Sequence, residues 1–172
     1  KEKNPFYGFF GDRPYYAERI GGVDSLVKNS NSLIQRQSGF YQYDIMQKFS
    51  IKQSDKVMHY LNAQYSGSSN VPRYDRLTDP KGSGLNSAEW YYGPQKRFMA
   101  AYQMEYKSLG SALDRVWLSL SYQNVFESRH NRNFGGVNRT NRREYVDVVG
   151  YTLDMEKRLR KHFFKFGLDG QY

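Results

Sequence analysis

The sequence predicts an all-β fold, an antiparallel transmembrane β-barrel segment of six or more long strands, with short turns on one side and long loops on the other. Apolar and polar residues alternate through six segments of about 10–12 residues, which is longer than the usual strand of a soluble protein. The connections between these segments are short, long, short, long and short in turn. Aromatic residues make up 17% of the chain, with 16 Tyr and 11 Phe, and these residue types favour strands.

The first three predicted strands cover residues 40–51, 57–66 and 97–107. In the first strand, the odd positions from Tyr41 to Ile51 are mostly apolar and the even positions are mostly polar. A short polar turn at 52–56 separates it from the second strand, which alternates in the same way. Because side chains in a strand point to opposite faces in turn, this pattern predicts one apolar and one polar face.

The next three predicted strands cover residues 115–126, 144–155 and 163–172. Short turns at 108–113 and 156–162 precede the first and the last of them. In the middle strand, Val146 and Val148 have the opposite parity to Val149 and the apolar residues that follow. A β-bulge within this strand is therefore expected.

The remaining segments define the predicted domain organisation. Residues 1–39 are predicted as an N-terminal loop or strand region, and residues 40–172 as the strands of an incomplete barrel, with external loops at about 67–96 and 127–142. Within the N-terminal region, 8–20 is a candidate for a further strand and 32–39 for an extension of the first one. Bacterial barrels have at least about eight strands. The chain is therefore expected to be part of a larger barrel.

The composition excludes several classes of protein. Cysteine is absent, which excludes disulfide scaffolds, thiol catalysis and cysteine-based zinc sites. No apolar run approaches the roughly 20 residues of a membrane helix, whereas membrane strands need only about 9–11. The net charge of +9 indicates either an anionic partner or solvated basic faces. Nucleic acid is not predicted as a partner, because the aromatic residues are spread over every strand and not gathered in one groove.

The polar face of the strands carries Gln, Ser, Asn, Asp and Gly with scattered charge. This composition suits the interior of a wide barrel in contact with water or a plug. A soluble sandwich or lipocalin would expose that face to water and carry many Lys and Glu on it. Two alternatives stay open: a passive porin, and a soluble β-barrel or sandwich that binds a small ligand or glycan.

The chain is not predicted to be an enzyme. His59, His130 and His162 share no metal-ligand spacing, and no phosphate loop or nucleophile elbow is present. No catalytic residue, metal site or cofactor is therefore predicted. A haem-ligand role for His130 is weighed against a solvated loop histidine, and the second interpretation is favoured.

The predicted loop at 67–96 holds the motifs RYDR and EWYYGPQKR. Rigid aromatics beside arginines are typical of binding hot spots. The alternative, which is favoured, is a self-packed loop in which Arg73, Asp75, Arg76 and Glu89 form ion pairs and the aromatics stack. The candidate ligand-binding residues are Arg73, Tyr74, Arg76, Trp90, Tyr91, Tyr92, Arg129 and His130.

The segments SGFYQYDIMQKF, NVPRYDRLTD, AEWYYGPQKR, YQNVFESRHNR and RREYVDVVGYTLD resemble the barrel region of TonB-dependent outer-membrane receptors. The resemblance covers about residues 31–172. It implies a plugged barrel of about 22 strands in the outer membrane of a Gram-negative bacterium, importing a scarce nutrient such as an iron chelate, haem or cobalamin. The implied partners are outer-membrane lipid and lipopolysaccharide, the plug domain, the TonB complex through an N-terminal part outside this sequence, and a surface lipoprotein.

Overall fold

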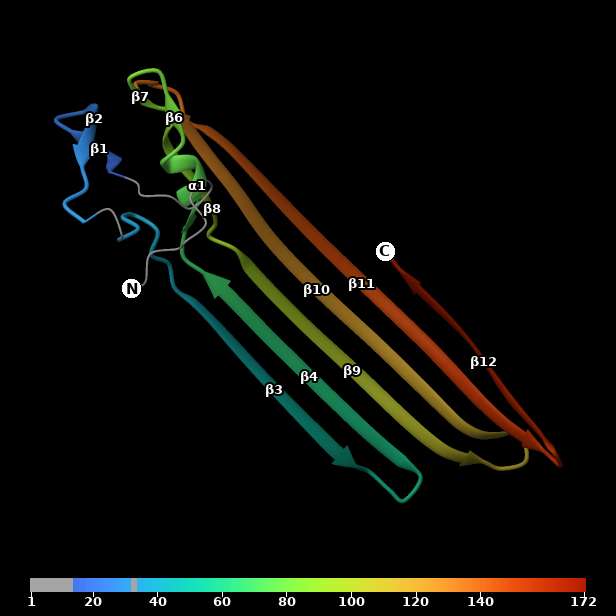
Figure 1. The fold of residues 1–172 in the computed structure, drawn as a ribbon. Coiled ribbons are helices and arrows are strands. Elements are labelled where there is room, and N and C mark those ends of the chain that lie inside the picture. The colour runs from blue at the N-terminus through green and yellow to red at the C-terminus, as the bar shows by residue number, and fades with distance from the viewer. Residues whose placement is uncertain (1–13, 32–33) are drawn as a thin grey trace. The chain divides into compact units, whose positions relative to one another are not determined.

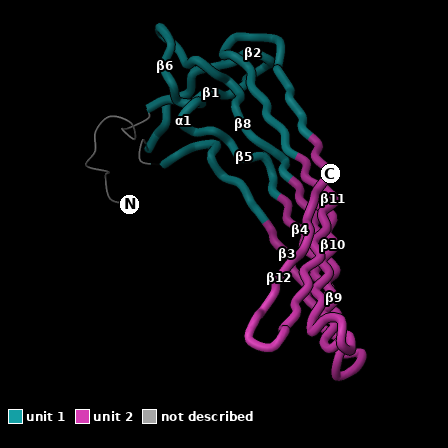
Figure 2. Tube along the Cα trace, turned by 90° about the vertical axis from the view of Figure 1, so that its right-hand side faces the viewer, with its two compact units in different colours: residues 1–42, 68–95, 127–144 teal, residues 43–67, 96–126, 145–172 magenta. Residues whose placement is uncertain are grey.

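The computed structural model describes residues 14–31 and 34–172, and that part of the chain consists mostly of strands, with one short helix (Figure 1). The strand pairings are antiparallel, which confirms the all-β class. Within the described residues the strands do not close into a barrel. The chain divides into two compact units, the first formed by 1–42, 68–95 and 127–144 and the second by 43–67, 96–126 and 145–172 (Figure 2).

Six long strands form an antiparallel meander in which each strand pairs with its neighbour along the chain, in the order β12-β11-β10-β9-β4-β3. They are β3 (Gln42–Lys52), β4 (Val57–Ser68), β9 (Lys96–Leu109), β10 (Leu113–Asn133), β11 (Thr140–Leu159) and β12 (His162–Gln171). All six predicted strands are therefore confirmed. The short turns between β3 and β4, β9 and β10, and β11 and β12 are confirmed as well.

The register of the meander gives the second unit one apolar and one polar face. Leu61 on β4 pairs with Tyr102 on β9, and Tyr102 pairs with Leu120 on β10. One position along, Gln103 pairs with Tyr60 on β4 and with Ser119 on β10. Because a slip of one residue would move every side chain to the other face, the alternating pattern specifies this register strongly.

The expected bulge in β11 is not supported by the side-chain contacts of the second unit. The rings of Phe126 and Tyr145 lie 4.7 Å apart. The hydroxyl of Tyr122 donates to Asp147 Oδ1 at 2.7 Å. Tyr145 and Asp147 therefore share the face of Phe126 and Tyr122, and the same parity continues to Val149. The two valines that prompted the expectation project from the polar face, so the alternation runs without a shift.

In the first unit, β1 (Tyr15–Ile20) and β2 (Val23–Lys28) form a hairpin with its own two-stranded sheet. Gly21 and Gly22 make its turn with φ of 58° and 84°, a region that favours glycine. The candidate strand at 8–20 is thus a strand from Tyr15 onwards, while 8–13 lies outside the described residues. The expected extension of the first long strand is wrong for 34–39, which forms no strand, and 32–33 lies outside the described residues.

The two predicted external loops contain more regular structure than expected. The first holds β5 (Val71–Pro72), α1 (Tyr74–Leu77), β6 (Pro80–Lys81), β7 (Gly84–Leu85) and β8 (Ser87–Tyr92). The second, predicted at 127–142, is mostly strand and leaves only 134–139 between β10 and β11. The end of β10 has no apolar alternation. It is extended because its backbone pairs with β8, with His130 opposite Tyr91.

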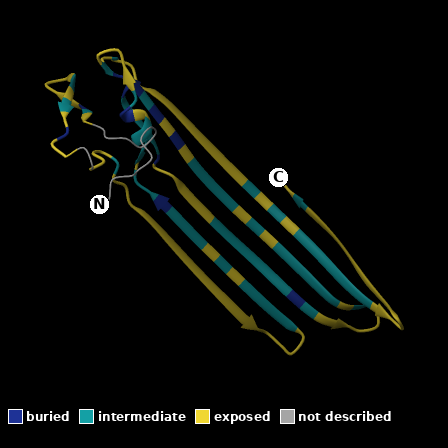
Figure 3. Ribbon diagram, in the orientation of Figure 1, coloured by how far each residue is buried: buried dark blue, intermediate teal, exposed yellow. Residues whose placement is uncertain are grey.

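Few of the described residues are buried (Figure 3). Ala17, Leu77 and Leu85 are the buried hydrophobic residues among them. The buried polar or charged residues are Asn29, Thr78, Ser87, Glu105, Ser128, His130 and Arg132. Among the described residues, burial therefore follows polar networks more than an apolar core. No helix in the described part of the chain has the length and hydrophobicity to cross a membrane.

Candidate functional site

Arg73, just before α1, organises the aromatic residues of β8. Its Nε and Nη2 donate to the two carboxylate oxygens of Asp75 at 2.8 and 2.6 Å, and its Nη1 donates to the Tyr92 hydroxyl at 3.2 Å. Its guanidinium carbon lies 4.9 Å from the ring centre of Trp90. The Trp90 and Tyr92 rings meet edge to face, with their centres 5.1 Å apart. The guanidinium also holds the pKa of Asp75 below its usual value. These groups bind one another, as the self-packed interpretation predicts.

Tyr91 points to the opposite face of β8, where it stacks on His130 with ring centres 4.7 Å apart. His130 Nδ1 lies 2.5 Å from Asn141 Oδ1. The histidine is only 7% exposed, so the expectation of a solvated loop histidine is wrong. Burial arises because β8 and β11 flank the end of β10, which the sequence pattern did not reveal. The haem-ligand role, which the sequence did not favour, stays a hypothesis, although little of the ring is open to a ligand.

Arg132, two residues after His130, was not among the predicted site residues. Its Nη1 and Nη2 donate to the Asp24 carboxylate at 2.5 and 2.9 Å, and its Nε donates to Glu89 Oε1 at 2.7 Å. The backbone N–H of Gly135 also donates to Asp24. The Asp24 and Arg132 side chains are 3% and 4% exposed, and Arg132 lowers the pKa of Asp24. No local sequence signal links two residues so far apart in the chain.

The remaining predicted site residues, Tyr74, Arg76 and Arg129, differ in their exposure and in their partners. Arg76 is exposed, with Asp75 at 3.8 Å and Asp79 at 4.0 Å, while Tyr74 is half-buried in α1. Arg129 is exposed, and its guanidinium lies 5.2 Å from the ring centre of Tyr92. The structure thus gathers Arg73, Trp90, Tyr92 and Arg129 on one side of β8 and separates them from Tyr91 and His130 on the other.

The sequence suggested that Glu89 pairs with Arg73 or Arg76, and it pairs with neither of them. It lies 2.7 Å from Arg132 and 3.5 Å from Arg139. The reason is that adjacent residues of a strand point to opposite faces, so Glu89 and Trp90 cannot contact the same partner.

Among the described residues no carboxylate pairs with Arg129. Its guanidinium therefore combines a cation–π contact with free donors, an arrangement that suits an anionic solute.

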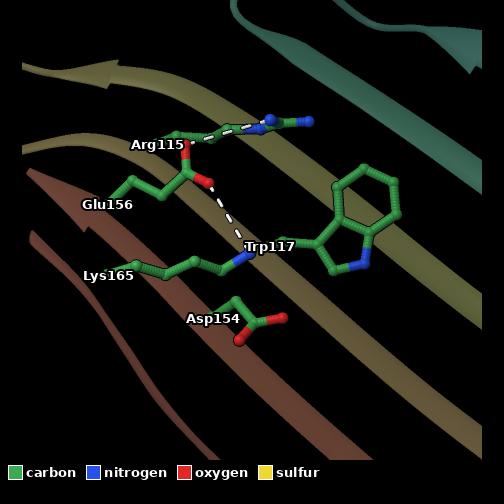
Figure 4. Close-up of a pocket in the computed structure, with 5 residues that line it drawn as sticks. All are labelled: Arg115, Trp117, Asp154, Glu156 and Lys165. Atoms are coloured by element: carbon green, nitrogen blue, oxygen red, sulfur yellow. Dashed lines mark ion pairs between the residues drawn. The ribbon is translucent and has the colours of Figure 1, made fainter. Parts of the chain in front are cut away.

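A second candidate site is a hollow on the polar face of the second unit (Figure 4). It is lined by Arg115 and Trp117 of β10, Asp154 and Glu156 of β11, and Lys165 of β12. Glu156 lies between Arg115, at 3.9 Å, and Lys165, at 3.8 Å. The sequence pattern missed this hollow because each strand contributes only one or two of its residues, and their meeting depends on the register.

The charged row of this hollow continues onto β9. Glu105 is 2.7 Å from Arg115 and 3.6 Å from Lys107, and its side chain is 7% exposed. Arg115 also lies over the Trp117 ring, with 5.7 Å to its centre. Alternating charges from four neighbouring strands therefore form one network on the polar face. Across the described residues, no three His, Asp or Glu side chains lie together as metal ligands do.

Comparison of the chain with protein-family models, with curated proteins and with solved structures finds no match. The resemblance to TonB-dependent receptors accordingly stays a prediction.

Proposed function

We propose that the chain forms part of the transmembrane β-barrel of a TonB-dependent outer-membrane receptor, which imports a scarce nutrient such as an iron chelate, haem or cobalamin. One observation carries the proposal. Leu61 and Leu120, each 44% exposed, and Phe98, 39% exposed, lie on β4, β10 and β9, strands that have partners on both edges. In a soluble sheet a second layer would cover such an apolar face. Within the described residues nothing covers it, and hydrocarbon is a suitable solvent for it.

The opposite face supports a barrel with a wet interior. Glu105, Arg115, Glu156 and Lys165 form their charge network there. Charged side chains facing hydrocarbon are costly, by about 2–4 kcal/mol for Arg or Lys at the bilayer midplane. A membrane-spanning sheet with these two faces therefore has to turn its polar face towards water or protein.

Aromatic pairs near one end of the strands support a membrane interface at that level. Tyr43 and Tyr65 have ring centres 5.9 Å apart on β3 and β4. The rings of Phe98 and Tyr122 lie 6.3 Å apart on β9 and β10. Together with Phe126 and Tyr145, these rings make a row across neighbouring strands on the apolar face. Aromatic girdles of this kind flank the apolar band of outer-membrane barrels.

The two outermost strands add a requirement to the proposal. β3 and β12 are the ends of the strand order, and within the described residues neither pairs with a strand on its outer edge. Open sheet edges are not tolerated in hydrocarbon. In the proposed barrel, further strands therefore pair with both edges.

Solute capture would use the exposed Arg129 beside Tyr92, with Trp90 as a stacking surface.

Membrane fractionation tests the proposal. The protein that carries this chain is expressed in a Gram-negative host, and the outer membrane is isolated and washed with alkaline carbonate. We expect the protein to stay in the washed membrane and to leave it only with detergent. Protein that stays monodisperse in plain buffer would contradict the proposal and favour the soluble β-barrel or sandwich.

Energy dependence separates a receptor from a passive porin. Uptake of candidate solutes is followed in cells that contain the protein, with and without an uncoupler of the proton-motive force. A TonB-dependent receptor is expected to lose uptake when the force is removed, because import depends on energy from the inner membrane. Unchanged uptake of a small solute would identify a porin instead.

A further inference from the structure

The β1–β2 hairpin is attached to the rest of the first unit by polar contacts more than by apolar burial. Its strands pair with each other and, among the described residues, with no other strand. Most of its large apolar side chains are exposed: Tyr15, Ile20, Val23 and Leu26. Ala17 is its one buried apolar residue in the described part of the chain. Hydrophobic burial therefore contributes little to holding the hairpin in place.

The hairpin is also closed at its own base. The backbone N–H of Asn29 donates to the carbonyl of Pro14 at 2.6 Å, and its side-chain amide donates to the carbonyl of Ile34 at 2.9 Å. Strand register runs without a break from Tyr15 opposite Lys28 to the turn. The hairpin thus satisfies its own backbone hydrogen bonds and can leave the neighbouring sheet as one piece. An isolated two-stranded hairpin is only marginally stable, so its amides are protected less once it has left.

Asp24 makes an ion-pair contact between the hairpin and the sheet of β8 and β10. Its carboxylate accepts from both terminal nitrogens of Arg132 and from the backbone N–H of Gly135. Arg132 belongs to β10 and also binds Glu89 of β8 and the carbonyl of Gly136. When one partner of an almost fully buried ion pair is removed, the other charge stays buried without compensation, which is costly. We therefore expect Asp24 and Arg132 to separate completely when the contact breaks.

We propose that the β1–β2 hairpin is a hinged cover over the β8–β10 sheet and that the Asp24–Arg132 pair is the latch that holds it closed. When the latch opens, the hairpin leaves as a unit and uncovers the guanidinium of Arg132 beside Glu89. The cover then switches this face between a neutralised and a charged surface. The inference does not depend on a membrane location, since every contact in it lies within the first unit.

Hydrogen–deuterium exchange of the intact protein tests the latch, with Asp24→Asn as the variant because it removes the charge and keeps the shape. We expect amide exchange to rise by at least about tenfold in peptides from 15–28 and 129–136, and to stay unchanged in peptides from 57–66 and 98–107. Unchanged exchange in the hairpin would overturn the proposal. A uniform rise in all strands would also overturn it, since the pair would then serve general stability.

A matched control and a double variant complete the test. Asp55→Asn removes a carboxylate from the exposed pair with Lys52, and we expect it to leave exchange in the hairpin unchanged. In an Arg132→Met background the latch is already lost, so Asp24→Asn is expected to add no further exchange. An additional rise in the double variant would show that Asp24 holds the hairpin through another partner and would contradict the proposal.

Discussion

The guanidinium of Arg73 lies 4.9 Å from the ring centre of Trp90. Its N–H groups also donate hydrogen bonds to the Asp75 carboxylate and to the Tyr92 hydroxyl. An arginine with this many partners has few donors left for a solute. It acts as a clamp that orients Trp90 and Tyr92. In the proposed receptor, Arg129 is therefore the better candidate for contact with an anionic solute, since its guanidinium is exposed and contacts only the Tyr92 ring among the described groups.

Arg73→Lys is expected to loosen the segment around α1 and β8. Lysine cannot reproduce the two-pronged contact with Asp75 or the planar contact with Trp90. The local free energy of opening should fall by about 1 kcal/mol, the net contribution of one typical intramolecular hydrogen bond, because the pair is partly exposed to solvent. Faster amide exchange in peptides covering 71–78 and 87–92 would show it. Arg76→Lys is the control, because its pairs are long and exposed, and it should leave the same peptides unchanged.

Acid should release the same clamp. Arg73 lowers the pKa of Asp75 below its usual 3.8, so the carboxylate stabilises the fold above that value, and this stabilisation is lost as the pH falls through the lower folded pKa. A Trp117→Phe background leaves Trp90 as the single tryptophan. Its fluorescence should be constant from about pH 7 to about pH 5 and change only below the usual aspartate value.

Asp75→Asn in that background provides the control for the pH experiment. Its Trp90 fluorescence at neutral pH should already resemble the acid form, and it should show no transition in the range where Asp75 titrates. A transition of the same size in both proteins would show that another group, and not Asp75, controls the environment of Trp90.

Glu105→Gln is expected to destabilise the polar face more than Glu156→Gln. Glu105 is buried and lies 2.7 Å from Arg115, whereas Glu156 makes two contacts near 4 Å. Removing the charge of Glu105 should cost about 1–3 kcal/mol, discounted because Arg115 is partly exposed, and removing that of Glu156 less than about 1 kcal/mol. Denaturant unfolding of the two variants in detergent measures the difference. Equal losses would show that the network acts as a whole.

A charge on the apolar face should have a different effect from the same charge on the polar face. Leu120→Arg would put a guanidinium into hydrocarbon in the proposed barrel, and we expect a loss of about 2–4 kcal/mol and poor recovery from the outer membrane. Ser119→Arg, one position away on β10, should be recovered nearly as well as the unaltered protein. If the two variants behave alike, the apolar face does not contact lipid.

The local alternation of apolar and polar residues was sufficient to predict the long strands and which residues lie on each face. Alternation from Tyr41 to Ile51 and in the five later segments predicts six long strands, because a period of two sustained over about ten residues indicates a β-strand. The same pattern excludes a slip of one residue, which would place Leu61 or Leu120 on the polar face. The short turns follow from the polar residues between the strands. None of these features requires knowledge of distant residues.

The partners of the charged residues depended on the folded chain. Arg132 follows no apolar alternation, and its binding to Asp24 arises only when the hairpin lies on the β8–β10 sheet. Glu89 turned out to pair with Arg132 and not with the nearby Arg73, because its strand faces the other way. The strand character of 127–133 has the same origin, since backbone pairing with β8 supplies the hydrogen bonds that a loop would leave to water. A local pattern describes which face a residue occupies, whereas long-range pairing chooses the residue it meets there.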